Sequence, residues 1–285
     1  MLKTCRAAVK STTIDLVTAL AGFVYPDRCC ACDQAFYPPA TGTGSPSGSQ
    51  RPRIVKRDVD FSEVMAPFLC LECVTAFTEV DSPMCVTCGM VFKSRQAEDH
   101  VCGECHRNPK FFRSARAVGI YEQSLLKAVQ KLKYNGWTGL ARPLGELLLS
   151  GLRRWRRLPD IDLIVPVPLY PRKLRQRGFN QVVLMIRSWP VLFRRHQIDQ
   201  PDFRITEKAL VRKRETRSQT RLTKKERREN VRGAFAVKDR SVIKGRRILL
   251  IDDVYTTGAT VDECARTLKA AGSGEVDVLT LARVR

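Results

Sequence analysis

The sequence predicts an α/β domain built on a parallel sheet and preceded by a small cysteine-rich domain that holds two zinc ions. Three observations support this prediction. Eight of the eleven cysteines form four C-x-x-C pairs, all before residue 106. After residue 110, apolar runs of strand length alternate with segments of helical periodicity. One of these runs, residues 248–251, leads into two adjacent carboxylates and a threonine–glycine loop.

The C-x-x-C pairs predict the zinc sites. A C-x-x-C turn directs two thiolates at one tetrahedral ion, so two such turns complete a Cys₄ site and four complete two sites. Pairing the first turn with the second and the third with the fourth is the simplest arrangement, although the spacing also allows interleaved pairing. The predicted ligands are Cys29, Cys32, Cys70, Cys73, Cys85, Cys88, Cys102 and Cys105.

Other uses of the cysteines are less favoured. A disulfide framework needs an oxidising compartment, and redox catalysis would need a thioredoxin-like βαβ context around a C-x-x-C pair. Cys30 could replace a neighbour as ligand, but Cys29 and Cys32 have the better spacing. Cys264 follows the threonine–glycine loop on a predicted helix, and we expect it to be a small buried hydrophobic residue.

The N-terminal part has two features of an exported cytochrome. Residues 1–28 place basic residues before a partly apolar stretch, and the sequence at Cys102–Cys105–His106 fits a haem-attachment pattern. Asp15 and several threonines interrupt the apolar stretch, so we expect an amphipathic helix over residues 12–24 that packs on the protein. We interpret His106 as a neighbour of a zinc ligand. No stretch approaches the roughly 20 apolar residues of a membrane span.

The chain divides into three predicted regions: an N-terminal helical segment (1–28), a double zinc ribbon (29–110) and an α/β domain (111–285). A proline-, glycine- and serine-rich insertion at 38–52 is predicted to be disordered. In the last region the apolar spacing predicts, in order, a strand at 111–121, helices at about 125–133 and 140–155, a strand at 162–168, a helix at 179–189, a strand at 248–251, a helix at 261–268 and a strand at 275–282. Lys127, Lys131 and Lys133 of the first helix face solvent or ligand.

Residues 252–260 combine the groups that a phosphorylated sugar requires. Asp252 and Asp253 are followed after two residues by Thr256, Thr257, Gly258, Ala259 and Thr260. A loop between a strand end and a helix start binds anions, because the first N–H groups of the helix lack partners and its dipole favours negative charge. Carboxylates beside such a loop suit sugar hydroxyls or Mg²⁺. The alternative is a plain strand–turn–helix with a solvated pair of aspartates.

Charge is the outlier of the composition. The chain has 50 basic and 29 acidic side chains, a formal net charge of +21. Such an excess favours polyanionic partners and says nothing about the fold. Residues 207–232 are strongly basic and have three interpretations. They could form a solvated helix in their second half, a nucleic-acid-binding arm or, as a resemblance of residues 248–260 to phosphoribosyltransferases implies, a mobile lid over an anionic ligand.

Residues 248–260 resemble the phosphoribosyl pyrophosphate (PRPP) signature of type I phosphoribosyltransferases. The resemblance implies that Asp252 and Asp253 hold the ribose 2′ and 3′ hydroxyls. It further implies that the loop at 256–260 cradles the 5′-phosphate and that Mg²⁺ accompanies PRPP. The loop after the first core strand contacts pyrophosphate in this family. Here that loop falls near residues 168–177, whose cations are Arg172, Lys173, Arg175 and Arg177. A PRPP ligand also implies a cytoplasmic protein.

Further motifs extend the resemblance to the ComF family of competence-associated proteins. They are Pro-Val-Pro-Leu at 166–169, Arg-Gly-Phe-Asn-Gln at 177–181, Thr216-x-x-Gln219-x-x-Leu222 and Arg228-x-Asn230-Val231-x-Gly233-Ala234-Phe235. This family combines a double zinc ribbon with a phosphoribosyltransferase-like domain and is linked to the handling of incoming single-stranded DNA. The implied partners are PRPP or a related phosphoribosyl nucleotide, single-stranded DNA, and a competence helicase or other DNA-uptake proteins. The insertion and residues 187–203 depart from the family pattern.

Three functions fit these motifs. The first is a PRPP-binding accessory protein for DNA uptake, which the basic excess favours. The second is a metabolic phosphoribosyltransferase that transfers ribose 5-phosphate from PRPP to a base or amine. The third is a non-catalytic sensor of PRPP or nucleotides. No residue indicates a purine or pyrimidine specificity, and no catalytic residue is assigned.

Overall fold

The computed structural model describes residues 26–38, 60–93, 98–155, 161–195, 203–216 and 223–285. The helix predicted at 12–24 and nearly all of the insertion at 38–52 lie outside these residues. Among the described helices, none has the length and apolar character needed to cross a membrane.

A five-stranded, all-parallel sheet forms the centre of the α/β region, in the order β3-β9-β8-β4-β5. Its strands are β3 (Ser114–Ile120), β4 (Leu163–Pro166), β5 (Arg204–Ile205), β8 (Ile248–Tyr255) and β9 (Val276–Arg283). The central strands are apolar because helices or other segments cover both faces of the sheet. The predicted fold class is therefore confirmed.

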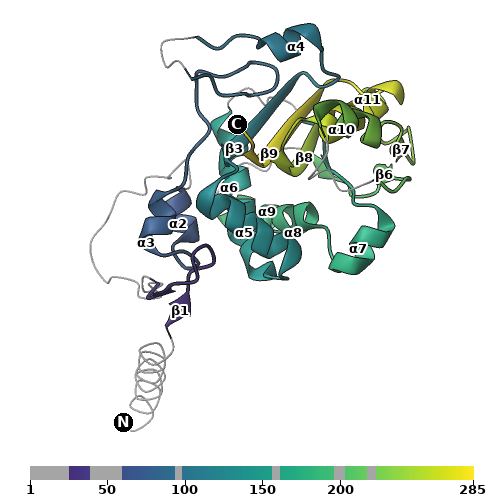
Figure 1. The fold of residues 1–285 in the computed structure, drawn as a ribbon. Coiled ribbons are helices and arrows are strands. Elements are labelled where there is room, and N and C mark those ends of the chain that lie inside the picture. The colour runs from purple at the N-terminus through teal and green to yellow at the C-terminus, as the bar shows by residue number, and fades with distance from the viewer. Residues whose placement is uncertain (1–25, 39–59, 94–97, 156–160, 196–202, 217–222) are drawn as a thin grey trace.

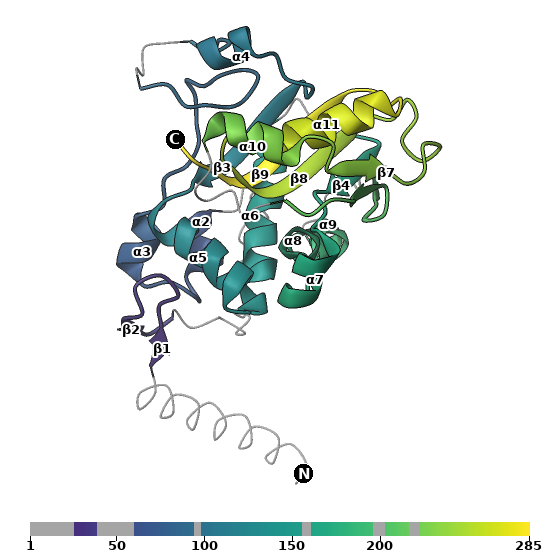
Figure 2. The ribbon, with the colours of Figure 1, turned by 45° about the vertical axis from the view of Figure 1, so that its right-hand side comes forward.

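The helices pack on both faces of this sheet (Figures 1 and 2). One face carries α5 (Gln123–Tyr134), α6 (Ala141–Arg154), α8 (Gln181–Arg187) and α9 (Trp189–Arg195). The other carries α10 (Lys224–Val231) and α11 (Ala259–Ala270). Alternate residues of β8 separate the two cores: Leu249 and Ile251 belong to the first, and Ile248 and Leu250 to the second.

The predicted elements of the α/β region are present with small differences in length. The helix predicted at 140–155 begins with a 3-10 turn, η1 (Thr138–Leu140), before α6. The helix predicted at 179–189 is divided at Ser188 into α8 and α9. After β4 a further helix, α7 (Pro171–Arg177), begins with proline and ends at Gly178, whose φ of +81° suits a glycine.

The basic segment 207–232 contains more order than the sequence indicates. Its first part forms β6 (Leu210–Arg212), which pairs antiparallel with β7 (Phe235–Val237). Its last part forms α10, whose N-terminus has a capping box between Thr223 and Glu226. Most of α10 is solvent-exposed, as the interpretation of the second half of this segment as a solvated helix predicts. Residues 217–222 lie outside the described chain, so the lid remains a prediction.

The cysteine-rich region consists of short elements on two sides of the sheet. The first two C-x-x-C pairs lie near β1 (Asp27–Arg28), β2 (Ala35–Phe36), α2 (Phe61–Met65) and α3 (Leu71–Thr75). The last pair flanks the start of α4 (Gly103–Arg107). Figures 1 and 2 show α3 and α4 well apart, with α3 beside α5. The domain boundaries at 28 and 110 remain predictions.

Candidate functional site

The two aspartates lie inside strand β8 and not after it. The apolar run predicts a strand that ends at residue 251, but β8 continues to Tyr255 because Asp252 and Val254 remain paired with β9. On its other side β8 loses its partner earlier, since β4 ends with the pairing of Pro166 and Ile251. The carboxylates therefore lie at the open carboxyl edge of the sheet, where ligands bind in doubly wound folds.

Asp253 points to the face that carries α5 and α8, and both of its oxygens accept hydrogen bonds. Lys133 Nζ lies 2.7 Å from Oδ1, and the Gln181 amide donates to Oδ2. The side chains of Lys133 and Asp253 are 14% and 7% exposed. Although burial opposes it, the neighbouring Asp253 holds the pKa of Lys133 above its ordinary value. Asp253 is thus a fixed, charge-paired carboxylate.

Asp252 lies on the opposite face of the strand, toward Arg212 and Cys264. Its Oδ1 accepts a hydrogen bond of 2.9 Å from the Asp253 backbone N–H. Burial, followed by the charge of Asp253, raises the pKa of Asp252 to about 7. The two carboxylates consequently differ: Asp253 is held by a cation, and the pKa of Asp252 is raised toward neutral pH.

The threonine–glycine loop, residues 256–260, connects β8 to α11. Gly258 is the N-cap of α11 with φ of +75°, and a Cβ at this position would overlap the Tyr255 hydroxyl. Both facts require glycine here. The Asp262 N–H already donates to the Gly258 carbonyl, so the helix begins directly at the loop. The predicted strand–loop–helix arrangement is present, and anion binding at it remains a prediction.

Basic side chains from three elements lie near the aspartates. Besides Lys133 of α5, Lys173 and Arg177 come from α7 and Arg212 from β6. Lys173 is an exposed residue, but desolvation of its amine, together with the nearby charges of Arg177, Arg212 and Lys133, lowers its pKa. Burial likewise lowers the pKa of Arg212, while Asp252 opposes this effect. Such mutual repulsion among cations is relieved when an anion binds between them.

The predicted pyrophosphate residues separate into two pairs. Lys173 acts electrostatically on Asp253, and Arg177 donates to Gln181, which in turn donates to Asp253. Arg172 instead lies 3.6 Å from the Glu215 carboxylate, and Arg175 is exposed on α7. The structure therefore brings only Lys173 and Arg177 close to the aspartates.

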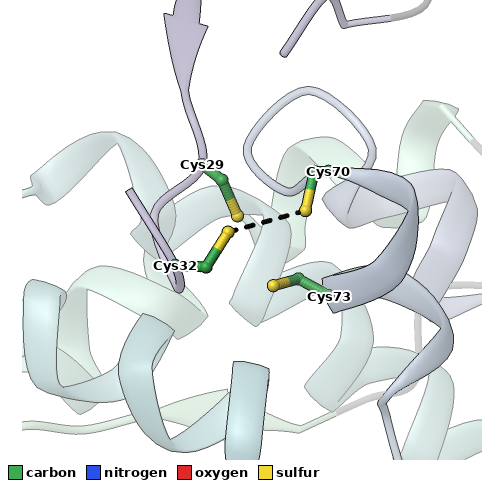
Figure 3. Close-up of side chains that lie close together, drawn as sticks. All are labelled: Cys29, Cys32, Cys70 and Cys73. Carbon is green, nitrogen blue, oxygen red and sulfur yellow. Dashed lines mark hydrogen bonds between the residues drawn. The ribbon is translucent and has the colours of Figure 1, made fainter. Parts of the chain in front are cut away.

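The eight predicted zinc ligands form two four-cysteine clusters. In each cluster all four sulfur atoms lie within 4.8 Å of one another, and the pairing joins adjacent C-x-x-C turns. In the first cluster, Cys29, Cys32, Cys70 and Cys73 converge (Figure 3), and Sγ of Cys32 lies 3.7 Å from Sγ of Cys70. Tetrahedral Zn–S bonds of about 2.3 Å place sulfur atoms roughly 3.8 Å apart, whereas a disulfide needs about 2.0 Å. The donor sets fit zinc.

The second cluster contains Cys85, Cys88, Cys102 and Cys105, and backbone N–H groups stabilise the thiolate of Cys85. Sγ of Cys85 accepts from the N–H groups of Cys88 and Cys102 at 3.4 and 3.3 Å. Although burial opposes them, these N–H groups lower the pKa of Cys85 to about 6, which favours the metal-binding thiolate. The haem pattern finds no support here, since Cys102 and Cys105 join two further cysteines and His106 is exposed.

The remaining described cysteines are buried outside both clusters. Cys30 is fully buried and does not belong to the first cluster, and burial raises the pKa of its thiol. Cys264 is also fully buried, as predicted. Neither residue is a candidate ligand.

Comparison with known proteins decides the family. A model of the phosphoribosyl transferase domain matches residues 202–285. "Competence protein F" of Haemophilus influenzae is 30% identical over 70% of this chain and 85% of its own length. The chain belongs to the ComF family. "DNA utilization protein YhgH" of Escherichia coli is 32% identical to this ComF-family chain, over 75% of this chain and 90% of its own.

"Competence protein ComFC" of Streptococcus pneumoniae is 27% identical to this ComF-family chain, over 75% of the chain and 87% of its own length. Among solved structures, one described as the allosteric regulatory enzyme of purine biosynthesis shares 16% identity. The match covers 66% of this chain and 32% of the chain in that structure, with a TM-score of 0.29. That likeness is too low to support an argument.

The sequence does not predict the contacts of three residues of the site in this ComF-family chain. Gln181 lies in a quoted motif, but its contact with Asp253 was not predicted. Lys133 is predicted to face solvent or ligand, but its pairing with Asp253 is not predicted, and Arg212 is only one charge of a basic segment. The signal that could have indicated Gln181 is its position at the start of α8, directly after the N-cap Asn180. The Asn180 side chain donates to the Val167 carbonyl and so holds this helix start beside the end of β4.

Proposed function

We propose that this ComF-family chain binds PRPP together with Mg²⁺ at the carboxyl edge of β8. The ribose hydroxyls would bind Asp252 and Asp253, and the 5′-phosphate would bind the loop at 256–260. The observation that supports this most directly is the position of two carboxylates beside a helix N-terminus, with cations from α5, α7 and β6 nearby. The matching phosphoribosyl transferase domain at residues 202–285 supports the same ligand.

Each group has a distinct role in this proposal. Lys133 and Gln181 fix Asp253 while leaving lone pairs on both oxygens for sugar hydroxyls. Lys173, Arg177 and Arg212 would neutralise the pyrophosphate. Asp252 supplies the hard carboxylate oxygens that Mg²⁺ prefers, and the metal would offset charge on the pyrophosphate. Loss of the Asp252 proton on binding would couple affinity to pH near 7.

Calorimetric titration of PRPP tests this proposal. We expect binding that needs Mg²⁺ and weakens at least tenfold in Asp253→Asn, since the variant loses the charge that Lys133 pairs with. The exposed Asp27, on β1, provides a matched Asp→Asn control that should bind normally. Titrations at pH 6.5 in buffers of different ionisation enthalpy should reveal proton release from Asp252. Equal affinity of Asp253→Asn and the parent protein would refute the assigned ribose site.

We further propose that the chain acts on single-stranded DNA in natural competence, in the cytoplasm with reduced thiols and two zinc ions. The net charge of +21 and the printed names of its relatives, which refer to competence and DNA utilisation, support this role. A salt titration of single-strand binding tests it, because phosphate contacts weaken steeply with salt. Absence of affinity near ~50 mM salt would remove the DNA role. Metal analysis should find about two zinc ions per chain.

Transfer to an acceptor is the second candidate, favoured by the name of the matching domain. In that reaction the bond from ribose C1 to pyrophosphate breaks, and a nitrogen of a base or amine forms the new bond to C1. The chain would contribute orientation and charge stabilisation of the leaving pyrophosphate. Pyrophosphate release should be measured across a panel of bases and amines. Binding of PRPP with no release for any acceptor would leave a non-catalytic PRPP-binding protein.

A further inference from the structure

The second cysteine cluster packs against the strand and helix that hold the phosphate loop. Its four cysteines share an apolar core with Tyr255 at the end of β8 and with Ala259 and Val261 at the start of α11. The first cluster lies in the other core, on the opposite face of the sheet, with α5, α6 and α8. The two metal sites therefore have different neighbours, and only the second is part of the structure beneath the loop.

One connection reaches the loop from its N-terminal side. Arg283 of β9 is 4% exposed, and its Nη1 donates a 2.6 Å hydrogen bond to the carbonyl of Cys88, a ligand of the second cluster. The same guanidinium lies over the Tyr255 ring, 5.3 Å from its centroid. The Tyr255 hydroxyl in turn fills the space beside Gly258, the N-cap of α11. A continuous line of contacts thus runs from a metal-site carbonyl to the phosphate loop.

A second connection reaches the loop from its C-terminal side. The segment after α4 passes the start of α11, where the Phe111 N–H donates to Asp262 Oδ1 at 2.8 Å. Phe112 meets the Tyr255 ring edge-on, with the centroids 6.4 Å apart. Glu104, between the last two cysteines, forms an ion pair with Arg228 of α10. Segments next to the second cluster therefore contact both ends of the loop, and Glu104 contacts α10, the helix in the last part of the basic segment.

We propose that Arg283 and Tyr255 couple the second Cys₄ site to the phosphate loop, so that metal in this site controls the order of the loop and its affinity for a phosphoribosyl ligand. The statement about affinity rests on the proposed function. A tetrahedral ion fixes the Cys85–Cys88 turn and hence the carbonyl that Arg283 needs. Without the ion this buried guanidinium loses its fixed acceptor, and the Tyr255 ring beneath Gly258 loses its support. Arg283 and Tyr255 would therefore position the loop without touching the ligand.

Hydrogen exchange of peptides spanning residues 252–262, measured without ligand, tests the coupling. Cys88→Ser should lose one zinc ion and exchange at least tenfold faster over 256–262. Cys73→Ser, in the first cluster, should lose one zinc ion and leave exchange at 256–262 unchanged. Arg283→Met should keep both zinc ions and still speed exchange, with partial rescue by Arg283→Lys. The control for the arginine substitution is Arg154→Met, which removes an ion pair with Glu79 on another part of the surface.

The decisive variant is Arg283→Met, because it leaves every metal ligand in place. Parental exchange rates in Arg283→Met with two bound zinc ions would overturn the coupling, as would equal loop exchange in Cys73→Ser and Cys88→Ser. Titration of PRPP into the same proteins separates this proposal from the proposed function. If the parent protein does not bind PRPP but Arg283→Met still exchanges faster at 256–262, the proposed ligand would be refuted and the coupling would stand. Unchanged exchange with intact PRPP binding would refute the coupling alone.

Discussion

Replacing Lys133 by methionine should destabilise the protein strongly, because it leaves the Asp253 carboxylate buried without its cation. The ion pair is 2.7 Å long, and the two side chains are only 14% and 7% exposed. Solvent therefore screens this pair little. Removing one partner of a buried pair costs about 3–5 kcal/mol of unfolding free energy. Methionine keeps the length and helix propensity of lysine, so the change isolates the charge.

Lys131, on the same helix, provides the matched control. Its pair with Asp33 is 3.2 Å long, but the Asp33 side chain is 66% exposed. Lys131→Met should cost less than about 1 kcal/mol, as exposed ion pairs do. Urea unfolding followed by circular dichroism, with zinc present, gives both values from the midpoint and slope.

The double variant Lys133→Met/Asp253→Asn completes the test. Because it removes both charges, it should be less destabilised than the sum of the two single variants, with a coupling energy of about 1–3 kcal/mol. A Lys133→Met variant as stable as Lys131→Met would refute the argument that this pair is buried and charged. Additive single variants would refute the pairing itself.

Two further predictions concern the aspartates and the loop. Since burial and Asp253 raise the pKa of Asp252 from 3.8 to about 7, the folded state binds a proton more tightly than the unfolded state. The free energy of unfolding should therefore fall as pH rises from about 4 to about 7. Asp252→Asn should flatten this decline and be more stable than the parent protein at pH 8, by up to ~4 kcal/mol at about 1.4 kcal/mol per pKa unit. An equally steep decline in the variant and the parent protein would contradict this. Gly258→Ala should weaken PRPP binding at least tenfold, because the added Cβ overlaps Tyr255. The control is Gly245→Ala: φ there is +70° and an added Cβ meets nothing within 4 Å, so this variant should only lose about 1–2 kcal/mol of stability. Equal PRPP affinities in the two variants would argue against the loop assignment.

The sequence predicted the parts of the fold whose signals are local. The apolar run at 248–251 and the spacing of Leu125, Val129 and Leu132 depend on burial against the sheet, and both appear in the structure as a strand and a helix. The extent of β8 was not predictable from this run. Polar residues at 252 and 253 resemble a strand end, and only pairing with β9 extends the strand to Tyr255.

The candidate site was predicted only where a motif carried it. Asp253 and Lys133 are separated by 120 positions, so their contact depends on how α5 packs against the sheet. Arg212 lies in a strand of three residues, too short for a periodic signal inside a basic segment. The pairing of the C-x-x-C turns also depends on tertiary structure, because their spacing alone permits several combinations.

A crystal structure of the zinc-loaded chain with PRPP and Mg²⁺ is the strongest test of the proposed PRPP site. We expect the 5′-phosphate on the backbone of residues 256–260, the ribose hydroxyls on Asp252 and Asp253, and pyrophosphate facing Lys173, Arg177 and Arg212. Density for PRPP elsewhere, for example on α10, with the loop at 256–260 empty, would contradict it.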